Sequence, residues 1–343
     1  MAAAAISFGG MRTPHAVFLL VAALSLASLA QAASWQYSRI GNPKDIQTQP
    51  TAGTAMMGGG DDLDEAFRWL CAKGNGGDFL VLRARGDDEY NAYVNGLCHP
   101  NSVATLIIPD LAAAEDPAVA EIIDRAEVLF ISGGDQANYI RNLQGTPVEK
   151  AINAHVAAGK PIGGTSAGLA VQGEFVYGAL GDKPDDPDLA SVQVLPNPYF
   201  DRVTLVRGFL KIPHLENLLT DTHFARRDRM GRTLGFLARI MQDGWSNSPR
   251  EVAVDEKSAV LVEADGKSTV VGAGKGAYFL RPTRKPDVCA KDQPLTFRRI
   301  SIYHAPTGAH FDLGQWKGNV GTSYFLSVEG GRIESTQIGG GIY

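Results

Sequence analysis

The chain has 343 residues, of which 44% are hydrophobic and 20% are charged, and its formal net charge is −5. This composition excludes a disordered tail protein, a collagen-like fibre and a disulfide-dense miniprotein, because each of those classes departs strongly from ordinary globular usage. The acidic balance offers no basic surface for phosphates and argues against a nucleic-acid-binding protein. The length is sufficient for one large domain or two of ordinary size.

The first 32 residues have the layout of a secretory signal peptide. Arg12 and His15 precede an apolar run at residues 16–30, and Ala30-Gln31-Ala32 supplies small residues where such peptides are processed. The run is shorter than the roughly 20 residues that span a bilayer. We therefore expect cleavage after Ala32 rather than a membrane anchor, and a secreted or periplasmic mature protein that no longer contacts a membrane.

The remaining chain is predicted to consist of an extended N-terminal arm at residues 33–53 and one domain at residues 54–343. Within the domain, strands are predicted at 54–57, 79–82, 103–108 and 128–131, and helices at 61–73, 87–97, 118–126 and 148–158. Such alternation with short connections is typical of α/β proteins with a doubly wound, mostly parallel sheet. The Asp- and Pro-rich segment 181–200 is expected to be a surface loop. Short strands between residues 251 and 280 are interpreted as an antiparallel C-terminal extension of the same domain.

A serine stands where a strand of this sheet is expected to end, which is where doubly wound folds place their active sites. Gly164-Thr165-Ser166-Ala167-Gly168 fits the G-x-S-x-G nucleophile elbow, a sharp turn between a strand and a helix. Small neighbours let the serine Oγ project from a strained backbone. The next backbone N–H, on Ala167, lies at a helix N-terminus and can stabilise an oxyanion.

His223 is the candidate base that a nucleophilic serine requires. Asp221 or Thr222 can cap a helix that starts here, which would place His223 in the first turn of that helix. Four arginines follow closely in an otherwise acidic chain, at positions 226, 227, 229 and 232. Because guanidinium groups match carboxylates, these arginines indicate an acidic substrate.

The third member of a triad would orient the imidazole, and either Asp255 or Glu256 can do so after the strand at 251–254. The three cysteines allow one disulfide and one remaining thiol. Cys71 and Cys98 are favoured because each follows a predicted helix, although the sequence leaves the pairing open. No cysteine or histidine cluster has zinc spacing, so neither a metal site nor a cofactor is predicted.

Three motifs together resemble the cyanophycinase group of serine peptidases, peptidase family S51, which also includes aspartyl dipeptidases. They are Ile131-Ser132-Gly133-Gly134-Asp135-Gln136, the elbow around Ser166, and Asp221-Thr222-His223-Phe224 with the arginines that follow. The similarity covers roughly residues 54–280. The resemblance implies a class I glutamine amidotransferase-like fold in which serine replaces cysteine.

By this resemblance Ser166 is the nucleophile, His223 the base and Glu256 the third member of the triad. Backbone N–H groups near Gly134 would complete an oxyanion hole with that of Ala167. The implied substrate-binding residues are Gln136, Asp221, Arg227, Arg229 and Arg232. The implied reaction is hydrolysis of cyanophycin, a polyaspartate with arginine on each β-carboxyl, or of related aspartyl peptides, to β-Asp-Arg dipeptides. A homodimer is a further expectation by analogy.

Two features depart from the pattern of the family. Thr222 stands where cyanophycinases usually have glutamine, and about six extra residues around 244–249 separate His223 from Glu256. The first departure leaves polymer and dipeptide substrates open, including an aspartyl or isoaspartyl dipeptidase activity. The second leaves Asp255 open as an alternative to Glu256.

Two other functions remain as alternatives. An α/β-hydrolase esterase would share the elbow but place its acid before its histidine, so that His304 or His310 would be the base. That order would leave the arginines and the Gly-Gly-Asp-Gln turn without a role. A secreted binding protein without turnover would keep the same scaffold, and failure of a serine-reactive phosphonate to label it would favour this alternative.

Overall fold

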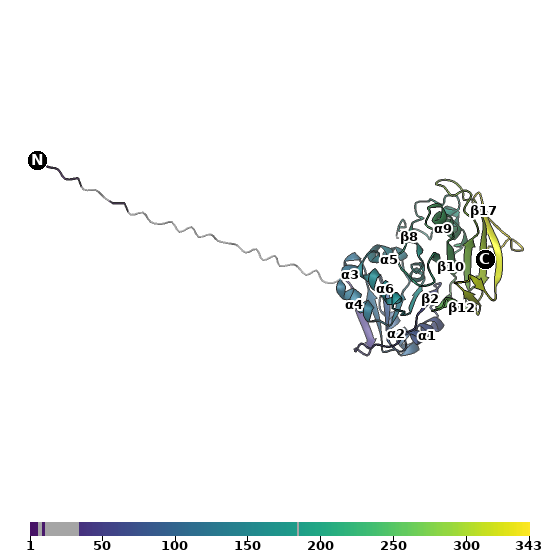
Figure 1. The fold of residues 1–343 in the computed structure, drawn as a ribbon, viewed down its shortest axis with the longest axis horizontal. Helices are drawn as coiled ribbons and strands as arrows, with labels where there is room; N and C mark the ends of the chain where they lie inside the picture. Colours follow the sequence, from purple (N-terminus) through teal and green to yellow (C-terminus); the bar gives the residue numbers. More distant parts are fainter. Residues whose placement is uncertain (6–8, 11–33, 184) are drawn as a thin grey trace. The chain divides into compact units, whose positions relative to one another are not determined.

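The computed structural model describes residues 1–5, 9–10, 34–183 and 185–343 (Figure 1). The chain divides into two compact units, Met1–Ala32 and Ala33–Tyr343. The apolar run of the predicted signal peptide and its expected cleavage site after Ala32 lie outside the described residues. No helix in the described part of the chain is both long enough and apolar enough to cross a membrane.

The second unit is built on a ten-stranded sheet with five parallel strands at its centre. In spatial order these are β4 (Ser102–Ile107), β3 (Asp78–Arg83), β5 (Val128–Ile131), β6 (Ile162–Thr165) and β2 (Gly53–Met57). Their side chains are almost all buried, as expected for strands covered on both faces. The prediction of an α/β fold with a mostly parallel core is therefore confirmed.

Helices cover both faces of this parallel core. α1 (Asp64–Lys73) and α2 (Glu89–Cys98) pack on alternate strand residues such as Phe79 and Phe130. The opposite face receives Leu80, Leu129 and their neighbours, packed against α3 (Leu111–Glu115), α4 (Pro117–Arg125), α5 (Gln136–Leu143) and α6 (Pro147–Ala157) (Figure 1). A disulfide joins Cys71 to Cys98 at the ends of α1 and α2, and Cys289 is a buried free thiol.

Helices α5 and α1 are among those that differ from the sequence-based expectation. α5 was not predicted, and it starts because the Asp135 carboxylate accepts a hydrogen bond from the Ala137 N–H and caps its N-terminus. The expected cap of α1 by Asp61 or Asp62 is wrong, since that helix begins after Leu63 without a side-chain cap. Asp62 instead accepts a hydrogen bond from the Tyr90 hydroxyl.

Antiparallel strands extend the ten-stranded sheet on both sides. β1 (Gln36–Gly41) pairs with β4, so the predicted N-terminal arm contributes an edge strand. On the other side, β2 is followed in turn by β11 (Ser258–Glu263), β12 (Lys267–Gly272), β15 (His310–Asp312) and β16 (Lys317–Gly318).

A second sheet of eight strands was not separated from the first by the sequence pattern. Its order is β18 (Arg332–Ser335), β17 (Thr322–Glu329), β14 (Phe297–Ala305), β13 (Ala277–Pro282), β10 (Arg250–Val254), β9 (Leu218–Asp221), β7 (Phe175–Tyr177) and β8 (Leu205–Arg207). β9 runs parallel to both β10 and β7. The C-terminal strands thus extend both sheets, and α9 (Met230–Gln242) packs its apolar face on this second sheet.

Candidate active site

The residues predicted to carry the chemistry, together with two glycine turns, follow five strand ends at one edge of the two sheets. Ser166 follows β6, Gly133 and Gly134 follow β5, and Gly58–Gly60 follow β2. From the second sheet, His223 comes shortly after β9 and Glu256 shortly after β10. Because the strands within each of these groups run parallel, their carboxyl ends deliver residues that are far apart in sequence to the same place.

Ser166 has the strained backbone of a nucleophile elbow, with φ 51° and ψ −118°. The turn forces its neighbours to be small. A Cβ on Gly168 would lie 1.9 Å from the Ile131 carbonyl oxygen, and a Cβ on Gly164 would lie 2.5 Å from the Gly168 carbonyl oxygen. α7 (Ala167–Ala170) begins directly after the serine, so the Ala167 N–H is at a helix start without an intrahelical acceptor.

The serine, the histidine and the glutamate form one hydrogen-bonded chain. Ser166 Oγ lies 2.8 Å from His223 Nε2, and His223 Nδ1 lies 2.7 Å from Glu256 Oε1. The carboxylate of Asp255, the other candidate, turns away and accepts a hydrogen bond from the Arg226 N–H. The sequence left this choice open, and the geometry selects Glu256 as the partner of the imidazole.

The two histidines of the esterase alternative lie elsewhere. His304 stacks on Tyr278 and hydrogen-bonds the Lys275 carbonyl oxygen, while His310 hydrogen-bonds Thr269. Neither ring is the partner of Ser166 in the described structure.

His223 is not in the first turn of a helix, which corrects the sequence-based expectation. α9 begins only at Met230, and His223 occupies an intervening turn with φ 48°. The Asp221 carboxylate cannot cap a helix at this point because it is bound by Arg232 through both of its oxygens. His223 is held instead by a hydrogen bond from its backbone N–H to the Gly58 carbonyl oxygen.

The turn Gly58–Gly60 forms a close-fitting support beneath the histidine and glutamate, a role that the sequence did not reveal. A Cβ on Gly58 would lie 2.0 Å from the Asp255 carbonyl oxygen, and a Cβ on Gly59 would lie 2.4 Å from His223 Cε1. Gly59 and Gly60 also have φ of 91° and 79°, which favours glycine at both positions. The three glycines therefore let the ends of β2 and β10 approach the imidazole.

The surroundings of the triad keep His223 neutral and Glu256 ionised. Burial lowers the pKa of His223 and the nearby guanidinium groups of Arg227 and Arg229 lower it further, against the opposing effect of Glu256. Partial burial opposes ionisation of Glu256, but its hydrogen bond with His223 and the charge of Arg227 outweigh this and lower its pKa. A neutral imidazole can accept a proton from Ser166, and an ionised carboxylate can stabilise the resulting cation.

A cavity of about 590 Å³ opens in front of Ser166. Most of the predicted binding residues line it, namely Gly134, Gln136, Ala167, Arg227, Arg229 and Arg232. Gly134 has φ 128°, and Gly133 lies close enough to Ser166 for an added Cβ to contact the serine Cβ at 3.5 Å. The glycine turn after β5 and the elbow after β6 thus form one wall of the cavity.

Asp221, which was also predicted to bind substrate, does not line the cavity. Its carboxylate is buried and accepts hydrogen bonds from Arg232, Thr233 and the Thr222 N–H. These contacts lower the pKa of Asp221 through the charges of Arg232 and Arg229, which outweigh the cost of burial. Asp221 is therefore placed to hold the arginines and not to contact a ligand in the cavity.

The arginines are less available to bind a substrate than the sequence suggested, because carboxylates of the protein already bind them. Arg232 is buried, is bound by Asp221 and stacks over Tyr177 with its guanidinium carbon 5.2 Å from the ring centroid. Arg227 and Arg229 both bind Asp188, at 3.0 and 2.8 Å. Asp188 comes from the segment that was expected to be a surface loop, and no local pattern connects it to arginines about 40 positions away.

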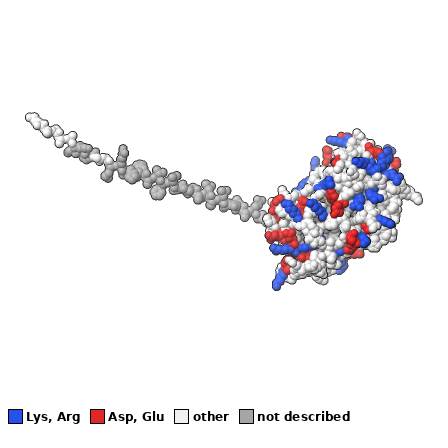
Figure 2. All heavy atoms as spheres, in the orientation of Figure 1, with Lys and Arg blue, Asp and Glu red and all other residues white. Residues whose placement is uncertain are grey.

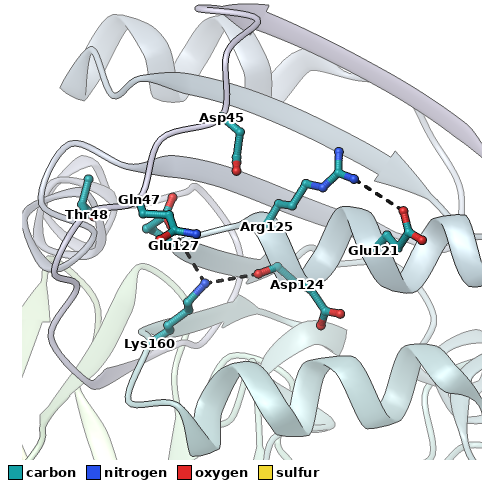
Figure 3. Close-up of a pocket in the computed structure, with 8 residues that line it drawn as sticks. All are labelled: Asp45, Gln47, Thr48, Glu121, Asp124, Arg125, Glu127 and Lys160. Atoms are coloured by element: carbon teal, nitrogen blue, oxygen red, sulfur yellow. Dashed lines mark hydrogen bonds and ion pairs between the residues drawn. The ribbon is translucent and has the colours of Figure 1, made fainter.

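A second hollow, of about 380 Å³, lies at the opposite edge of the ten-stranded sheet (Figure 3). Its residues include Glu127 and Lys160, which precede β5 and β6, whereas the elbow and the glycine turn follow these strands. Its charged groups contact one another, with Arg125 binding Glu121 and Lys160 near Glu127. None of its eight lining residues is a serine, cysteine or histidine, so the candidate active site is the cavity at Ser166.

The described surface carries both basic and acidic side chains. On the face drawn in Figure 2, basic and acidic side chains lie next to one another over most of the second unit. Among the described residues, no group of three or more histidine, cysteine or carboxylate side chains is arranged to hold a metal ion.

Parts of this chain are similar to known proteins. Residues 83–234 match the family described as Peptidase family S51. A cyanophycinase from Geminocystis herdmanii is 29% identical over 71% of this chain and 85% of its own length. One from Trichormus variabilis is 28% identical over 62% of this chain and 66% of its own length, just under two thirds.

Among solved structures, a peptidase from an acI-B1 Actinobacterium has a TM-score of 0.48 at 19% identity, covering 67% of this chain and 91% of that one. The sequence matches indicate a serine-type peptidase that is similar to the cyanophycinases and whose residues 83–234 match peptidase family S51.

Proposed function

We propose that this chain is an exported serine-type exopeptidase that hydrolyses cyanophycin, or related aspartyl peptides, to β-Asp-Arg dipeptides. The observation that carries the proposal is the hydrogen-bonded chain from Ser166 through His223 to Glu256 at the wall of a cavity. A nucleophile, a base and an acid in this order are the requirements of acyl transfer.

The reaction proceeds by attack of Ser166 Oγ on the scissile carbonyl carbon while His223 Nε2 takes the serine proton. The developing oxyanion is stabilised by the N–H of Ala167 and by backbone N–H groups at Gly134. His223 then protonates the leaving amine, and water hydrolyses the acyl-enzyme with the same histidine as base. Glu256 holds the imidazole through Nδ1, which fixes the tautomer that leaves Nε2 free to accept the proton.

The substrate assignment is supported by the relatives and by the cavity. The curated relatives that match carry the name cyanophycinase. The cavity is large enough for a dipeptide unit and contains both carboxylates and guanidinium groups, among them Asp135, Asp182, Arg227 and Arg229. Such a mixture suits a zwitterionic substrate that carries aspartate and arginine together.

Export is supported by the N-terminal sequence and by the disulfide. Residues 16–30 are apolar and are followed by small residues, as in a cleaved signal peptide. A disulfide between Cys71 and Cys98 is characteristic of oxidising compartments. The intact mass of protein recovered from the periplasm or medium checks this, and a mature chain that starts at Ala33 is expected.

The function is tested by incubating the protein, beside its Ser166→Ala variant, with purified cyanophycin and following released dipeptide by mass spectrometry. The proposal predicts β-Asp-Arg from the wild-type protein only. Isoaspartyl dipeptides are tested in parallel, because hydrolysis of these with no action on the polymer would replace cyanophycin as the substrate. Equal release by both proteins, or none from either substrate, would contradict the proposed function.

A further inference from the structure

The carboxylate of Asp188 occupies the position in the cavity that the sequence assigns to an acidic substrate. Asp188 Oδ2 lies 2.8 Å from Arg229 Nη2 and 3.0 Å from Arg227 Nη1, so one oxygen bridges both guanidinium groups. All three residues line the cavity in front of Ser166. We call Arg227 and Arg229 the arginine pair.

The guanidinium groups of the arginine pair already have carboxylate partners before any ligand enters. Arg232 is bound by the buried carboxylate of Asp221, which also contacts Arg229 at 3.4 Å. Arg227 approaches Glu256 at 3.6 Å, and the arginine pair shares Asp188. With Arg226, whose Nε lies 3.9 Å from Glu256 Oε2, four guanidinium groups face three carboxylates. An incoming substrate carboxylate would add a fourth negative charge unless it replaced one of the three.

Of the three carboxylates, Asp188 is the one that a ligand can replace. Its side chain is 51% exposed and that of Arg227 is 42% exposed, so this ion pair is weakened by water, whereas the side chain of its other partner, Arg229, is 9% exposed. The side chains of Asp221 and Arg232 are 5% and 3% exposed, which makes their separation costly. Glu256 is committed to His223 at 2.7 Å.

We propose that Asp188 is a tethered stand-in for a substrate carboxylate, and that an acidic peptide gains the arginine pair by displacing it. This inference rests on the proposed function only in assuming that the cavity receives a peptide. Asp188 thereby makes the site specific for acidic ligands, because a neutral ligand has no carboxylate that can bind the arginine pair in place of Asp188. The competition raises the concentration of acidic substrate needed for binding.

The exchange leaves the triad in an unchanged electrostatic environment. One carboxylate replaces another beside Arg227, so the charge acting on Glu256 and His223 stays the same. The pKa of Asp188 is lowered to about 2, because the arginine pair outweighs its burial, so the residue stays ionised at working pH. Displacement therefore depends on the ligand rather than on protonation, and it affects KM for acidic substrates more than kcat.

The test measures binding without turnover. The Ser166→Ala protein is titrated with N-acetyl-L-aspartate by calorimetry, with and without Asp188→Asn. We expect Asp188→Asn to tighten binding about two- to fivefold, since an exposed ion pair changes an equilibrium constant about fivefold at most. The matched control is Asp185→Asn, which makes the same charge change in the same segment at an exposed residue outside the cavity lining. It should leave the affinity unchanged.

Two further variants test whether a gain in affinity depends on the arginine pair and guard against instability of Asp188→Asn. Arg227→Gln added to Asp188→Asn should abolish the gain, because the freed site then lacks half of the arginine pair. Asp188→Ser repeats the test if Asp188→Asn proves unstable. Unchanged or weaker binding by both Asp188 variants, or a gain that survives Arg227→Gln, would overturn the proposal. These outcomes are independent of hydrolysis, so they are distinguishable from failure of the proposed peptidase activity.

Discussion

The imidazole of His223 has both ring nitrogens engaged, with Ser166 on one side and Glu256 on the other. Burial and two guanidinium groups oppose its protonation, while Glu256 favours it. This balance determines the pH range in which the histidine can act as a base. The pH dependence of the activity should therefore report the protonation of this single residue.

The pH profile of kcat/KM is expected to have its acid limb below pH 6.5, the ordinary pKa of histidine. The limb lies below pH 6.5 because His223 must be neutral to act as a base and its surroundings lower its pKa. Arg227→Gln removes one cause of this lowering and should move the limb to higher pH. Arg226→Gln is the control, since that side chain is 75% exposed and 3.9 Å from Glu256. A limb that stays in place in Arg227→Gln would contradict the electrostatic account.

Residue types identified Ser166 and His223, but they did not decide between Asp255 and Glu256 or give the state of the residues around the triad. Ser166 was identifiable because the elbow needs small residues at fixed spacing, and His223 because of its neighbours. The ion pairs of Asp188 with Arg227 and Arg229 join residues about 40 positions apart. No local pattern encodes such a pair, so the arginines looked free in the sequence.

At the scale of elements, the turn after β2 supports the site that β6, β9 and β10 supply. The backbone of Gly58 anchors His223, and Gly59 lies against its ring. In sequence, this glycine run was indistinguishable from an ordinary strand-to-helix turn. Its function depends on β10, which is nearly 200 residues away, and this is why sequence reasoning missed it.

Gly59→Ala is expected to reduce kcat at least about a hundredfold, because a misplacement of about 1 Å at a catalytic group has an effect of that size. The added Cβ would lie 2.4 Å from His223 Cε1 and must displace the ring. Gly76→Ala is the matched control. Gly76 has a similar positive φ of 76° but nothing within 4 Å of an added Cβ, so it imposes the backbone strain without the crowding. Equal losses of activity in the two variants would contradict a supporting role for Gly59.

Helix α9 and strand β10 enclose a second buried carboxyl beside Asp221. Glu251 is fully buried, and its Oε1 accepts a hydrogen bond from Thr233. Burial and the charge of Asp221 raise its pKa well above 4.5. Glu251 therefore keeps its proton in the folded protein at pH values where the unfolded chain has lost it.

This difference makes Glu251 a pH-dependent cost to stability. As pH rises above about 4.5, the unfolded state releases a proton that the folded state retains, so the folded state loses stability until its own pKa is passed. Glu251→Gln cannot titrate, and its free energy of unfolding relative to wild type should increase between pH 5 and pH 8. Urea unfolding at both pH values measures this. Glu115→Gln, at an exposed position in α3, is the control. A constant difference for Glu251→Gln would show that Glu251 is ionised when folded.

At the scale of the whole molecule, the sequence predicted the parallel core but not the second sheet. Continuous apolar strands that alternate with helices have few arrangements, and the five-stranded core follows from them. The later strands are short and could join either sheet, because pairing partners such as β11 with β2 are far apart in the chain. Their assignment depends on tertiary packing, which single-sequence patterns do not contain.

The disulfide is expected to stabilise the second unit by restricting its unfolded chain. Cys71 and Cys98 are separated by 27 positions, for which chain entropy gives roughly 3–4 kcal/mol. Reduction with dithiothreitol should therefore lower the melting temperature by several degrees. Cys289→Ser should show the same difference between oxidised and reduced protein, because Cys289 is not part of the disulfide. An identical melting temperature with and without reductant would contradict this stabilisation.

We infer that Ser166 is a nucleophile activated by His223, and labelling with a fluorophosphonate probe tests this without reference to any substrate. After incubation, the adduct is located by mass spectrometry of peptides from the wild-type, Ser166→Ala and His223→Ala proteins. We predict a single adduct on Ser166 in the wild type, none in Ser166→Ala and strongly reduced labelling in His223→Ala. An unlabelled wild-type protein, or an adduct on another serine, would contradict the account.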